Sequence, residues 1–578
     1  MKRLTRRDFL RVSALSVGAV AVSTGLQGCL VTDDPRPVRF DHGVASGDPL
    51  QDRVLLWTRI TPRESMPNEI PYHVSWEVAT DPDFLDLVHS GHTQAKQEHD
   101  FTVKVDVLNL VPGRTYYYRF KANGKYSPVG KTRTLPEGML EQVTLAVFSC
   151  ANYPAGYFHA YAEAAREDNL DAVVHLGDYL YEYKNGQYAT EDAEELGRLL
   201  PEDNDVELLT LTDYRKRYAL YHRDQDLQAL HATAPFIAVW DDHEVANDAW
   251  REGAENHNAG EGDYSDRKLA ALQAYFEWMP IRPADENDWE TVFRSFRFGD
   301  LVALHMLDTR IIGRDQQLDY ADYFDASGNF NQAQFQADLT DPNRTMLGAE
   351  QWGWLQNQMA TSSATWQVLG QQVLMGRMTL PAELLQLIQN PDPAQLLPKF
   401  AELGELKARY LAGDPTLTPT DIARIETVLP YNLDAWDGYF YERERVLGLA
   451  RQLNKNLVVL AGDTHNAWAN DLKDYAGNQV GVEFATSSVS SPGLEEYLQL
   501  PPQSVPQTEQ GLALLVDDLQ YLNINQRGYL RVTFTPEAAR ADWRYVTTIK
   551  SHDYSLDESR AMALQTRPGA GNRRIEPV

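Results

Sequence analysis

The sequence predicts a two-domain protein of the α+β/α/β class, an N-terminal β-sandwich followed by an α/β domain built on a parallel sheet. With 578 residues the chain is too long for one hydrophobic core, and its 43% hydrophobic content is ample for globular folding. Short β segments fill the region before residue 136, whereas strand and helix patterns alternate after Val143. The turn-rich segment 134–138 is the predicted boundary between the two domains.

The region 38–136 has the pattern of a β-sandwich. Its predicted strands are short, rich in β-branched and aromatic residues, and separated by Pro, Gly, Asp and Asn. They are residues 54–58 (VLLWT), 72–78 (YHVSWEV), 101–105 (FTVKV) and 115–120 (TYYYRF). The stretch 110–116 (LVPGRTY) resembles the turn before a late strand of fibronectin-like domains, which favours an Ig/fibronectin-like sandwich. We expect its aromatic residues to pack in the core and assign the domain no chemistry.

The region 143–550 alternates apolar runs with helical patterns, as βαβ units do. Helices are predicted at 158–167 and 268–278, and helical insertions at 185–230 and 375–430. Residues 296–307 predict a β-hairpin that returns into the core. The chain turns polar after residue 550, so we expect 551–578 to be a C-terminal tail whose last part, 568–578, is disordered.

Four of the apolar runs end in residues that can bind a metal ion. An aspartate with a tyrosine three residues later, as in Asp178 and Tyr181, suits a hard, highly charged cation. Open α/β sheets bind ligands at the carboxyl ends of their strands. One such end could simply cap a helix, but four together predict a polynuclear metal centre. The runs are 143–148 before Cys150, 172–176 before Asp178 and Tyr181, 236–240 before Asp241, Asp242 and His243, and 456–461 before Asp463 and His465.

Eight ordered blocks between residue 40 and about residue 550 give the chain a family resemblance. They are 43–49 (GVASGDP), 56–59 (LWTR), 148–150 (FSC), 177–182 (GDYLYE), 240–244 (WDDHE), 307–310 (LDTR), 436–439 (WDGY) and 462–465 (GDTH). In these blocks the sequence resembles the PhoD-type alkaline phosphatases, a calcium- and iron-dependent branch of the calcineurin-like metallophosphoesterases. The resemblance implies an αββα metallophosphoesterase sandwich for residues 143–550.

The resemblance also implies the ligands and the cofactors, Fe³⁺ and Ca²⁺, with two calcium ions expected. Asp178 would bridge the iron and calcium sides of the centre. Aspartates in place of the asparagine and histidine of ordinary superfamily members fit calcium, which prefers oxygen ligands. The remaining implied ligands are Cys150, Tyr181 and His465 on the ferric side, and Asp242 and Asp463 on the calcium side.

Three further residues are predicted to act in catalysis. By resemblance, His243 lies near the phosphate, where it stabilises the transition state or protonates the leaving group. A structural histidine bonded to Glu244 is the alternative. Asn152 would orient phosphate or contact calcium. Arg310 would pair either with substrate or, as a structural ion pair, with Asp308.

The implied activity is alkaline hydrolysis of phosphomonoesters and phosphodiesters, with attack by a metal-activated water. A phospholipase D-like or teichoic-acid-type phosphodiesterase would use the same centre and differ in the pocket walls. A non-catalytic metal- or phosphate-binding lipoprotein would need the ligands but not His243. The predicted partners are small-molecule phosphoesters. The net charge of −30 argues against a nucleic-acid-binding face.

Residues 1–29 have the pattern of an export signal. The basic start contains the pair Arg6 and Arg7, and the apolar stretch 12–26 is too short for a convincing membrane span. We therefore expect a Tat-type signal, recognition by the twin-arginine export machinery, and a periplasmic or extracellular location. Residues 26–29 (LQGC) also resemble a lipobox with Cys29 acylated, although Gln27 is unusual there, so a lipid anchor and ordinary cleavage both stay open.

Overall fold

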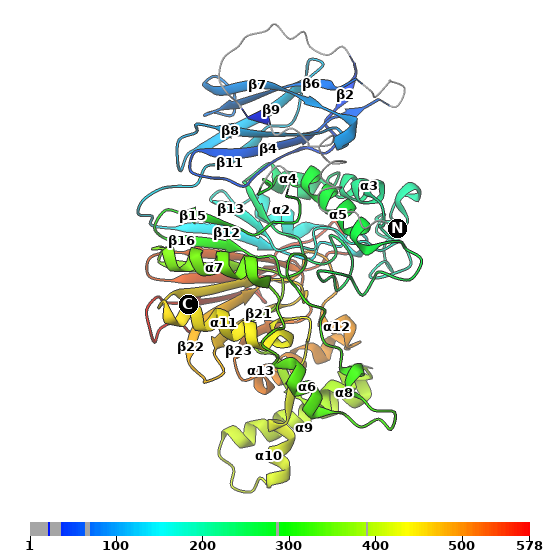
Figure 1. The fold of residues 1–578 in the computed structure, drawn as a ribbon, viewed down its shortest axis with the longest axis vertical. Coiled ribbons are helices and arrows are strands. Elements are labelled where there is room, and N and C mark those ends of the chain that lie inside the picture. The colour runs from blue at the N-terminus through cyan, green and yellow to red at the C-terminus, as the bar shows by residue number, and fades with distance from the viewer. Residues whose placement is uncertain (1–20, 23–35, 64–69, 285–287, 389–390) are drawn as a thin grey trace.

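The computed structural model describes residues 21–22, 36–63, 70–284, 288–388 and 391–578. Most of the predicted export signal, including the twin arginines and Cys29, lies outside the described residues. The molecule is elongated, with a β-rich end at the N-terminal part and a helical arm at the other end (Figure 1). Among the described residues, no helix is long and apolar enough to cross a membrane.

The N-terminal region consists of two groups of strands that share a core. One sheet contains β6 (Tyr72–Ala79), β7 (Leu87–Ala95), β9 (Thr115–Ala122), β10 (Lys125–Tyr126) and β11 (Gly130–Arg133). The other group is β3 (Val44–Gly47), β4 (Arg53–Arg59) and β8 (Thr102–Leu108), with which β1 (Ala21–Val22) pairs; β2 (Val38–Arg39) and β5 (Thr61–Pro62) form a separate ribbon. Val54 and Val105 of one group and Trp76 and Phe120 of the other belong to one hydrophobic cluster. The four predicted strands of this region are confirmed.

The second group of strands continues into a sheet of the region 143–550, called the catalytic region below because the family resemblance implies catalysis there. Gly47 of β3 pairs in parallel with Phe236 of β14 (Phe236–Ala238), and the Asp48 backbone N–H donates to the Phe236 carbonyl at 2.9 Å. A Cβ added to Gly47 would lie 2.1 Å from the Pro280 carbonyl oxygen, so no side chain fits there. The joined sheet has eleven strands in the order β1-β8-β4-β3-β14-β13-β12-β24-β25-β26-β27.

The catalytic region contains two sheets. In the eleven-stranded sheet, β12 (Val143–Phe148), β13 (Ala172–His175) and β14 are parallel, and β24 (Gly528–Phe534), β25 (Ala539–Tyr545), β26 (Met562–Thr566) and β27 (Glu576–Pro577) follow antiparallel. The seven-stranded sheet has the order β15-β16-β17-β20-β22-β21-β23. Its strands are β15 (Arg294–Phe298), β16 (Val302–Met306), β17 (Trp366–Gly370), β20 (Asn456–Ala461), β22 (Gln479–Ala485), β21 (Ala467–Lys473) and β23 (Leu519–Asn523). The predicted hairpin is β15–β16.

The side chains of β20 show how the second sheet is covered. Val458 and Leu460 join the core shared with β12 and β13, whereas Leu457 and Val459 join a second core under α7 (Gly348–Thr361) and α11 (Phe440–Gln452). This alternation places one core between the sheets and another beneath helices. Residues of α2 (His159–Ala165), α3 (Leu211–Tyr221), α4 (Gln225–His231) and α5 (Tyr264–Trp278) pack into the core that contains the first sheet (Figure 1).

The predicted helical insertion at 375–430 is confirmed as an arm. It comprises α8 (Ala382–Ile388), α9 (Pro393–Leu411) and α10 (Pro419–Glu426), carried by the two-stranded stem of β18 (Thr379–Pro381) and β19 (Val428–Pro430). α9 packs against α13 (Val505–Leu515), and α6 (Gln332–Leu339) lies near the base of the arm (Figure 1).

The C-terminal segment differs from the expected disordered tail. β26 and β27 extend the eleven-stranded sheet, and buried Arg573 donates to Asn456 Oδ1 at 2.9 Å and to Asn454 Oδ1 at 2.7 Å. Polar composition suggested a solvated tail, but here the polar side chains bond to the end of α11 and the start of β20.

Candidate metal centre

The carboxyl ends of the central strands of both sheets meet at one buried point. Cys150 follows β12, Asp178 follows β13, Asp242 follows β14, and Asp463 and His465 follow β20. Two glycines allow the close approach, Gly177 between the ends of the neighbouring strands β13 and β14, and Gly462 between the ends of β20 and β12 in the two sheets. A Cβ on Gly177, which has φ of 105°, would lie 2.3 Å from the Asp241 nitrogen, and one on Gly462 would lie 2.6 Å from the Ser149 side chain. The prediction that these strand ends come together is confirmed.

Four of these residues have left-handed backbone conformations, which non-glycine residues rarely adopt. The φ angles are 61° at Cys150, 53° at Asp178, 62° at Asp463 and 64° at His465. Each such residue costs on the order of 1–3 kcal/mol, and such residues cluster at functional sites. The backbone is therefore held in an unfavourable conformation where the side chains converge.

On one side of the site, a thiol, a carboxylate, an imidazole and a phenol gather. Ligand atoms of Cys150, Asp178 and His465 all lie within 4.8 Å of one another. The Tyr181 hydroxyl donates to Asp178 Oδ2 at 3.0 Å and lies 3.2 Å from His465 Nε2. His465 Nδ1 donates to the Pro492 carbonyl at 2.7 Å, which leaves Nε2 directed at the cluster.

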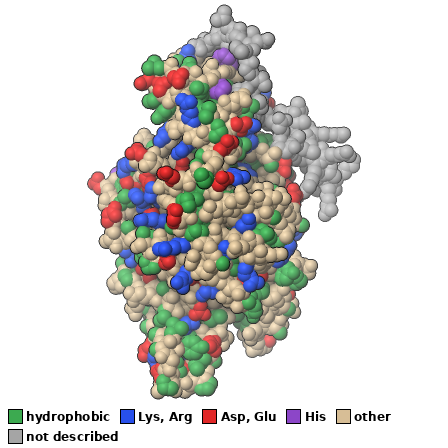
Figure 2. Space-filling model, turned by 90° about the vertical axis from the view of Figure 1, so that its left-hand side faces the viewer, with side chains coloured by type: hydrophobic (Ala, Val, Ile, Leu, Met, Phe, Trp, Pro, Cys, Tyr) green, Lys and Arg blue, Asp and Glu red, His purple; other side chains and the backbone are tan. Residues whose placement is uncertain are grey.

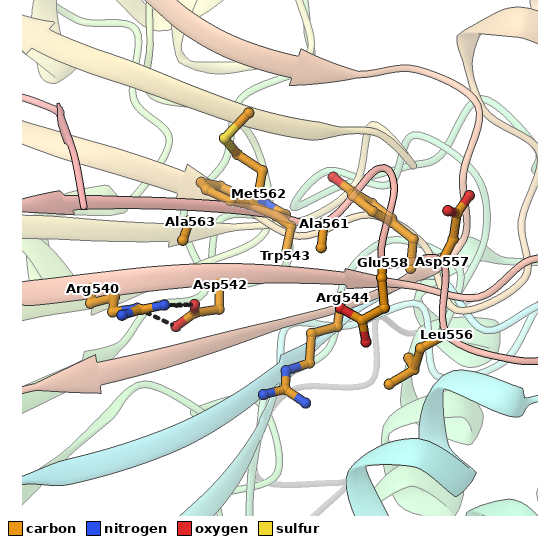
Figure 3. A pocket seen from close by; sticks show the side chains of 11 residues that line it. Arg540, Asp542, Trp543, Arg544, Leu556, Asp557, Glu558, Ala561, Met562 and Ala563 are labelled. Carbon is orange, nitrogen blue, oxygen red and sulfur yellow. Dashed lines mark hydrogen bonds and ion pairs between the residues drawn. The ribbon is translucent and has the colours of Figure 1, made fainter.

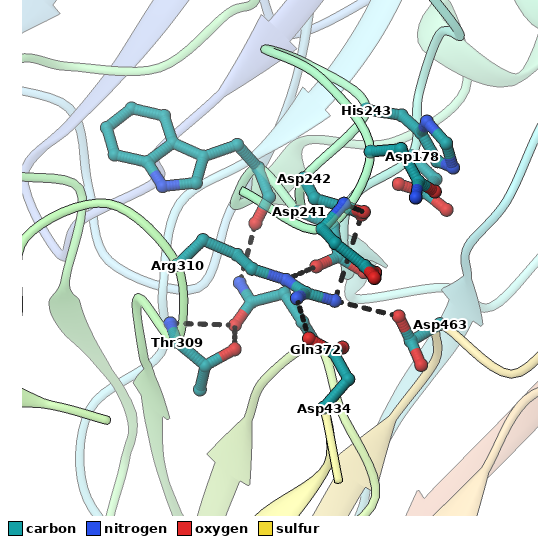
Figure 4. Close-up of polar contacts among 12 residues, drawn as sticks. Asp178, Asp241, Asp242, His243, Thr309, Arg310, Gln372, Asp434 and Asp463 are labelled. Carbon is teal, nitrogen blue, oxygen red and sulfur yellow. Dashed lines mark hydrogen bonds and ion pairs between the residues drawn. The ribbon is translucent and has the colours of Figure 1, made fainter. Parts of the chain in front are cut away.

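On the other side, carboxylate oxygens of Asp241, Asp242 and Asp463 also lie within 4.8 Å of one another. Buried Arg310 lies among them (Figure 4). Its Nε donates to Asp241 at 2.6 Å, Nη1 to Asp434 at 2.8 Å and Nη2 to Asp463 at 2.8 Å.

The expected pairing of Arg310 with Asp308 is wrong. The Asp308 carboxylate instead accepts the backbone N–H groups of Arg310, Ile311 and Ile312, at 2.8, 2.8 and 2.9 Å, and so closes the turn after β16. Because each guanidinium nitrogen already bonds a different carboxylate, Arg310 has the contacts of a positioning residue rather than of a group that binds substrate.

The electrostatics favour bound cations. Burial raises the pKa of Asp178, Asp463 and Cys150 well above their usual values, and the carboxylates that surround each group raise it further, despite His243 beside Asp178 and Arg310 beside Asp463. Burial lowers the pKa of His465 to about 3, so the imidazole is neutral, as a metal ligand must be. Asp178 Oδ1 and Asp241 Oδ2 are buried and have no hydrogen-bond partner among the described residues. Sulfur, nitrogen and oxygen donors with free lone pairs fit a metal centre.

His243 is held by a carboxylate that the sequence did not single out. Its Nδ1 donates to Glu182 Oε2 at 2.7 Å, and Glu182 is fully buried. The other Glu182 oxygen accepts from the Asn247 backbone N–H at 2.8 Å and the Asn256 side chain at 2.7 Å. Burial would lower the pKa of His243, but Asp242, Glu182 and Asp178 outweigh it and raise that pKa well above its usual value. His243 Nε2 is therefore a proton donor at the edge of the site.

The alternative partner of His243, Glu244, has another role. Its carboxylate accepts the backbone N–H groups of Asp178, Tyr179 and Asp241, at 3.0, 2.5 and 2.7 Å. It therefore joins the loops after β13 and β14, which carry two of the predicted ligands.

Asn152 lies buried in the loop after β12, two residues beyond Cys150. Its carbonyl accepts from Ser490 Oγ at 2.7 Å, while its Nδ2 has no partner among the described residues. The structure thus leaves the Asn152 amide available for a ligand.

Sequence reasoning missed several residues of the site. Glu182 directly follows Tyr181 in the block 177–182, which was a usable signal. Asp434 follows the helical arm with no metal-binding pattern around it. Gln372, after β17, accepts from Thr309 Oγ1 at 2.6 Å and donates to the Trp240 carbonyl at 2.7 Å, and only the fold brings these segments together (Figure 4).

A separate surface cavity lies along β25 and the segment before β26. Its lining includes the exposed ion pair of Arg540 and Asp542, 2.6 Å apart, and none of the predicted ligands (Figure 3).

Comparison with known proteins agrees with this geometry. The model of the family described as "PhoD-like phosphatase" matches residues 145–543, and that of "PhoD-like phosphatase, N-terminal domain" matches residues 26–136. The chain is 33% identical over 589 aligned positions to alkaline phosphatase D of Bacillus subtilis (strain 168), with 99% of this chain and 89% of the relative covered. It also matches a solved structure described as "Structure of PhoD", with a TM-score of 0.73, 32% identity, and coverage of 93% of this chain and 92% of the other.

Proposed function

Because the chain belongs to the PhoD-like phosphatase family, we propose that it is an exported alkaline phosphatase that hydrolyses phosphomonoesters and phosphodiesters at a centre of Fe³⁺ and Ca²⁺. One observation carries this proposal. Strand ends from two sheets bring a thiol, a phenol, an imidazole and several carboxylates into neighbouring groups, in each of which the candidate ligand atoms lie within 4.8 Å of one another.

The donor set divides into two kinds of ligand. Cys150, Tyr181 and His465 would hold the ferric ion with Asp178, because thiolate and phenolate prefer a highly charged cation. Asp242 and Asp463 would hold calcium, and Asp241, with its unpartnered oxygen, is a further oxygen donor on that side. When bound, the ions would activate a water molecule and neutralise the charge of the phosphate oxygens.

Side chains of the protein would donate the proton to the leaving group and position the carboxylates and the phosphate. The Glu182 carboxylate accepts from His243 Nδ1 and stabilises the imidazolium form, whose Nε2–H can protonate the leaving oxygen. Arg310 holds Asp241, Asp434 and Asp463 in place and offsets part of their mutual repulsion. Asn152, whose buried Nδ2 has no hydrogen-bond partner among the described residues, would orient the phosphate.

The finer architecture and location belong to the same proposal. The shared cores support an Ig/fibronectin-like sandwich at 38–136 and an αββα sandwich at 143–550. The twin-arginine pattern supports export to the periplasm or the exterior, with a lipid anchor if Cys29 is acylated. The net charge of −30 supports small phosphoesters rather than nucleic acid as substrates, and the face in Figure 2 carries both basic and acidic side chains.

Turnover of p-nitrophenyl phosphate and bis-p-nitrophenyl phosphate at alkaline pH tests the proposal. We expect hydrolysis of both, loss of activity in EGTA, and recovery with calcium but not with magnesium or zinc. Activity that persists in EGTA with calcium verified absent would refute the calcium assignment. Metal and phosphate binding without turnover would identify a binding lipoprotein, and turnover of the diester alone would identify a phosphodiesterase.

A further inference from the structure

Two tyrosines that no part of the proposed mechanism uses lie beside His243. The rings of Tyr183 and Tyr188 are partly exposed, unlike the buried ring of Tyr181. Their centroids lie 5.6 and 6.4 Å from the His243 ring, and the Tyr188 ring is nearly parallel to it, at 12°. The two tyrosine rings contact each other with a centroid distance of 5.4 Å. We name Tyr183 and Tyr188 the aromatic shelf.

The shelf is fixed in place from several directions. The Tyr188 hydroxyl bonds the hydroxyl of Tyr497, at the end of α12 (Leu494–Tyr497), at 2.6 Å. The Tyr188 ring also stacks on Tyr181 at a centroid distance of 5.8 Å. The bond between the two hydroxyls joins distant segments of the chain, since Tyr188 and Tyr497 are 309 residues apart in the sequence. A rigid ring costs little conformational entropy when it binds a ligand.

The position of the shelf relates it to the departing half of the substrate. When the leaving oxygen lies within reach of His243 Nε2, the substituent on that oxygen lies beside the rings that adjoin His243. Of these rings, Tyr183 and Tyr188 are the ones that a ligand can contact, because Tyr181 is buried.

We propose that the aromatic shelf is the leaving-group subsite and selects esters of flat, aromatic alcohols, with phenols as the model class. This inference rests on the proposed phosphatase function and specifies its substrate class. Stacking on Tyr183 and Tyr188 stabilises the bound ester and aligns its leaving oxygen with His243.

The experiment compares two substrates in each variant, because a ratio of rates cancels damage to the centre itself. For phenyl phosphate and glycerol 1-phosphate, kcat/KM is measured in the wild type and in Tyr183→Leu, Tyr188→Leu and the double variant. Loss of ring stacking should lower the phenyl-to-glycerol ratio by about 3–10-fold per ring. The change should appear mainly in KM for phenyl phosphate.

Tyr188→Phe and Tyr183→Phe are the matched controls. They keep the rings, so the ratio should stay within about 2-fold of wild type whatever happens to the two rates separately. Iron content, measured in each variant, identifies any substitution that disrupts the centre.

The outcomes separate the two proposals. A wild-type protein that hydrolyses neither ester would overturn the proposed function. Hydrolysis of both, with a ratio that the Leu variants leave unchanged, would overturn the subsite and assign the rings to packing alone. Equal loss in the Phe and Leu variants would show that the hydroxyls act, not stacking.

Discussion

The Tyr181 hydroxyl lies among the candidate ligands of the proposed ferric site. Burial raises its pKa well above the usual value, while its hydroxyl lies 3.0 Å from Asp178 and 3.2 Å from His465. A ferric ion would convert it to a phenolate and give a visible charge-transfer band. Tyr181→Phe should shift or bleach that band with little harm to folding.

Tyr179 supplies the matched control for this spectrum. It is also buried, but its hydroxyl lies 3.0 and 2.9 Å from the Nε2 atoms of His222 and His231 rather than at the centre. Tyr179→Phe should therefore keep the band. A Tyr181→Phe spectrum identical to the parent, in protein with full iron content, would contradict the assignment.

The bond between Glu182 and His243 predicts a second effect at the residue scale. His243→Ala should lower turnover about 10²–10⁴-fold with bound metal unchanged, since a general acid contributes that much. Glu182→Gln should lower it in the same direction but less, because the amide can present its oxygen to Nδ1 without the charge. Both deficits should shrink for a leaving group as good as nitrophenolate.

Metal analysis is the safeguard for these variants. Loss of iron or calcium in His243→Ala would make His243 a ligand, which its grouping with Asp178 and Asp242 within 4.8 Å also permits. A deficit that is equal for good and poor leaving groups would exclude proton donation.

At the residue scale, the sequence predicted which candidate ligands lie close together but not which residues hold them in position. Cys150, Asp178, Asp463 and His465 each end a buried apolar run, and the carboxyl-end rule brings such ends together. The partners of Arg310 could not be inferred, because Asp434 and Asp463 lie 124 and 153 residues away from it and only the folded chain places them in contact. Hydrogen-bond partners depend on distances that a linear pattern does not contain.

At the scale of elements, Glu244 couples the loops after β13 and β14. It accepts three backbone N–H groups, of Asp178, Tyr179 and Asp241, and burial raises its pKa to about 8. Glu244→Gln would replace an accepting oxygen with an NH₂ group that faces backbone donors. We expect a loss of about 1–3 kcal/mol in the free energy of unfolding, together with weaker iron binding.

Chemical denaturation and elemental analysis check this prediction. Glu537→Gln, in an exposed turn between β24 and β25, is the control and should change neither quantity. Full stability and full iron content in Glu244→Gln would show that the two loops are held by other contacts.

The regular elements were the most predictable, for a physical reason. A strand such as β12 is apolar except for Thr144 because both of its faces are buried, and its bounds match the apolar run. The strands β26 and β27 were missed because β26 has an apolar run of only three residues and β27 is two residues long, too short for a periodic pattern. The arm formed by α8, α9 and α10 was predictable as helical, whereas its stem of two three-residue strands was not.

At the scale of the whole molecule, buried neutral histidines make stability depend on pH. Burial lowers the pKa of His175 to about 3 and of His305 to about 4, below the usual 6.5. Between these values and 6.5 the unfolded chain binds protons that the folded chain does not, so the free energy of unfolding falls as pH drops below about 6.5. For His305 alone the loss reaches about 3 kcal/mol near pH 4.

Denaturation midpoints between pH 7 and pH 4 test this dependence. His305 accepts from Ser295 Oγ at 2.7 Å and donates to Gln367 Oε1 at 3.1 Å, so His305→Gln removes one titrating group and should flatten the slope. Exposed His73, changed to Gln, should leave the slope as it is. Equal slopes in all three proteins would show that acid sensitivity arises elsewhere.

The joint between β3 and β14 bears on whether the two halves can be separated. Sequence patterns place a boundary near residue 136, yet Gly47 and Phe236 unite the halves in one sheet. A polypeptide truncated to start after that boundary would leave β14 with an uncovered edge, the kind of surface that recruits other chains into aggregates. The N-terminal half therefore covers the edge of β14 in the catalytic half. Another domain could replace it only if that domain also supplied a strand that pairs with β14.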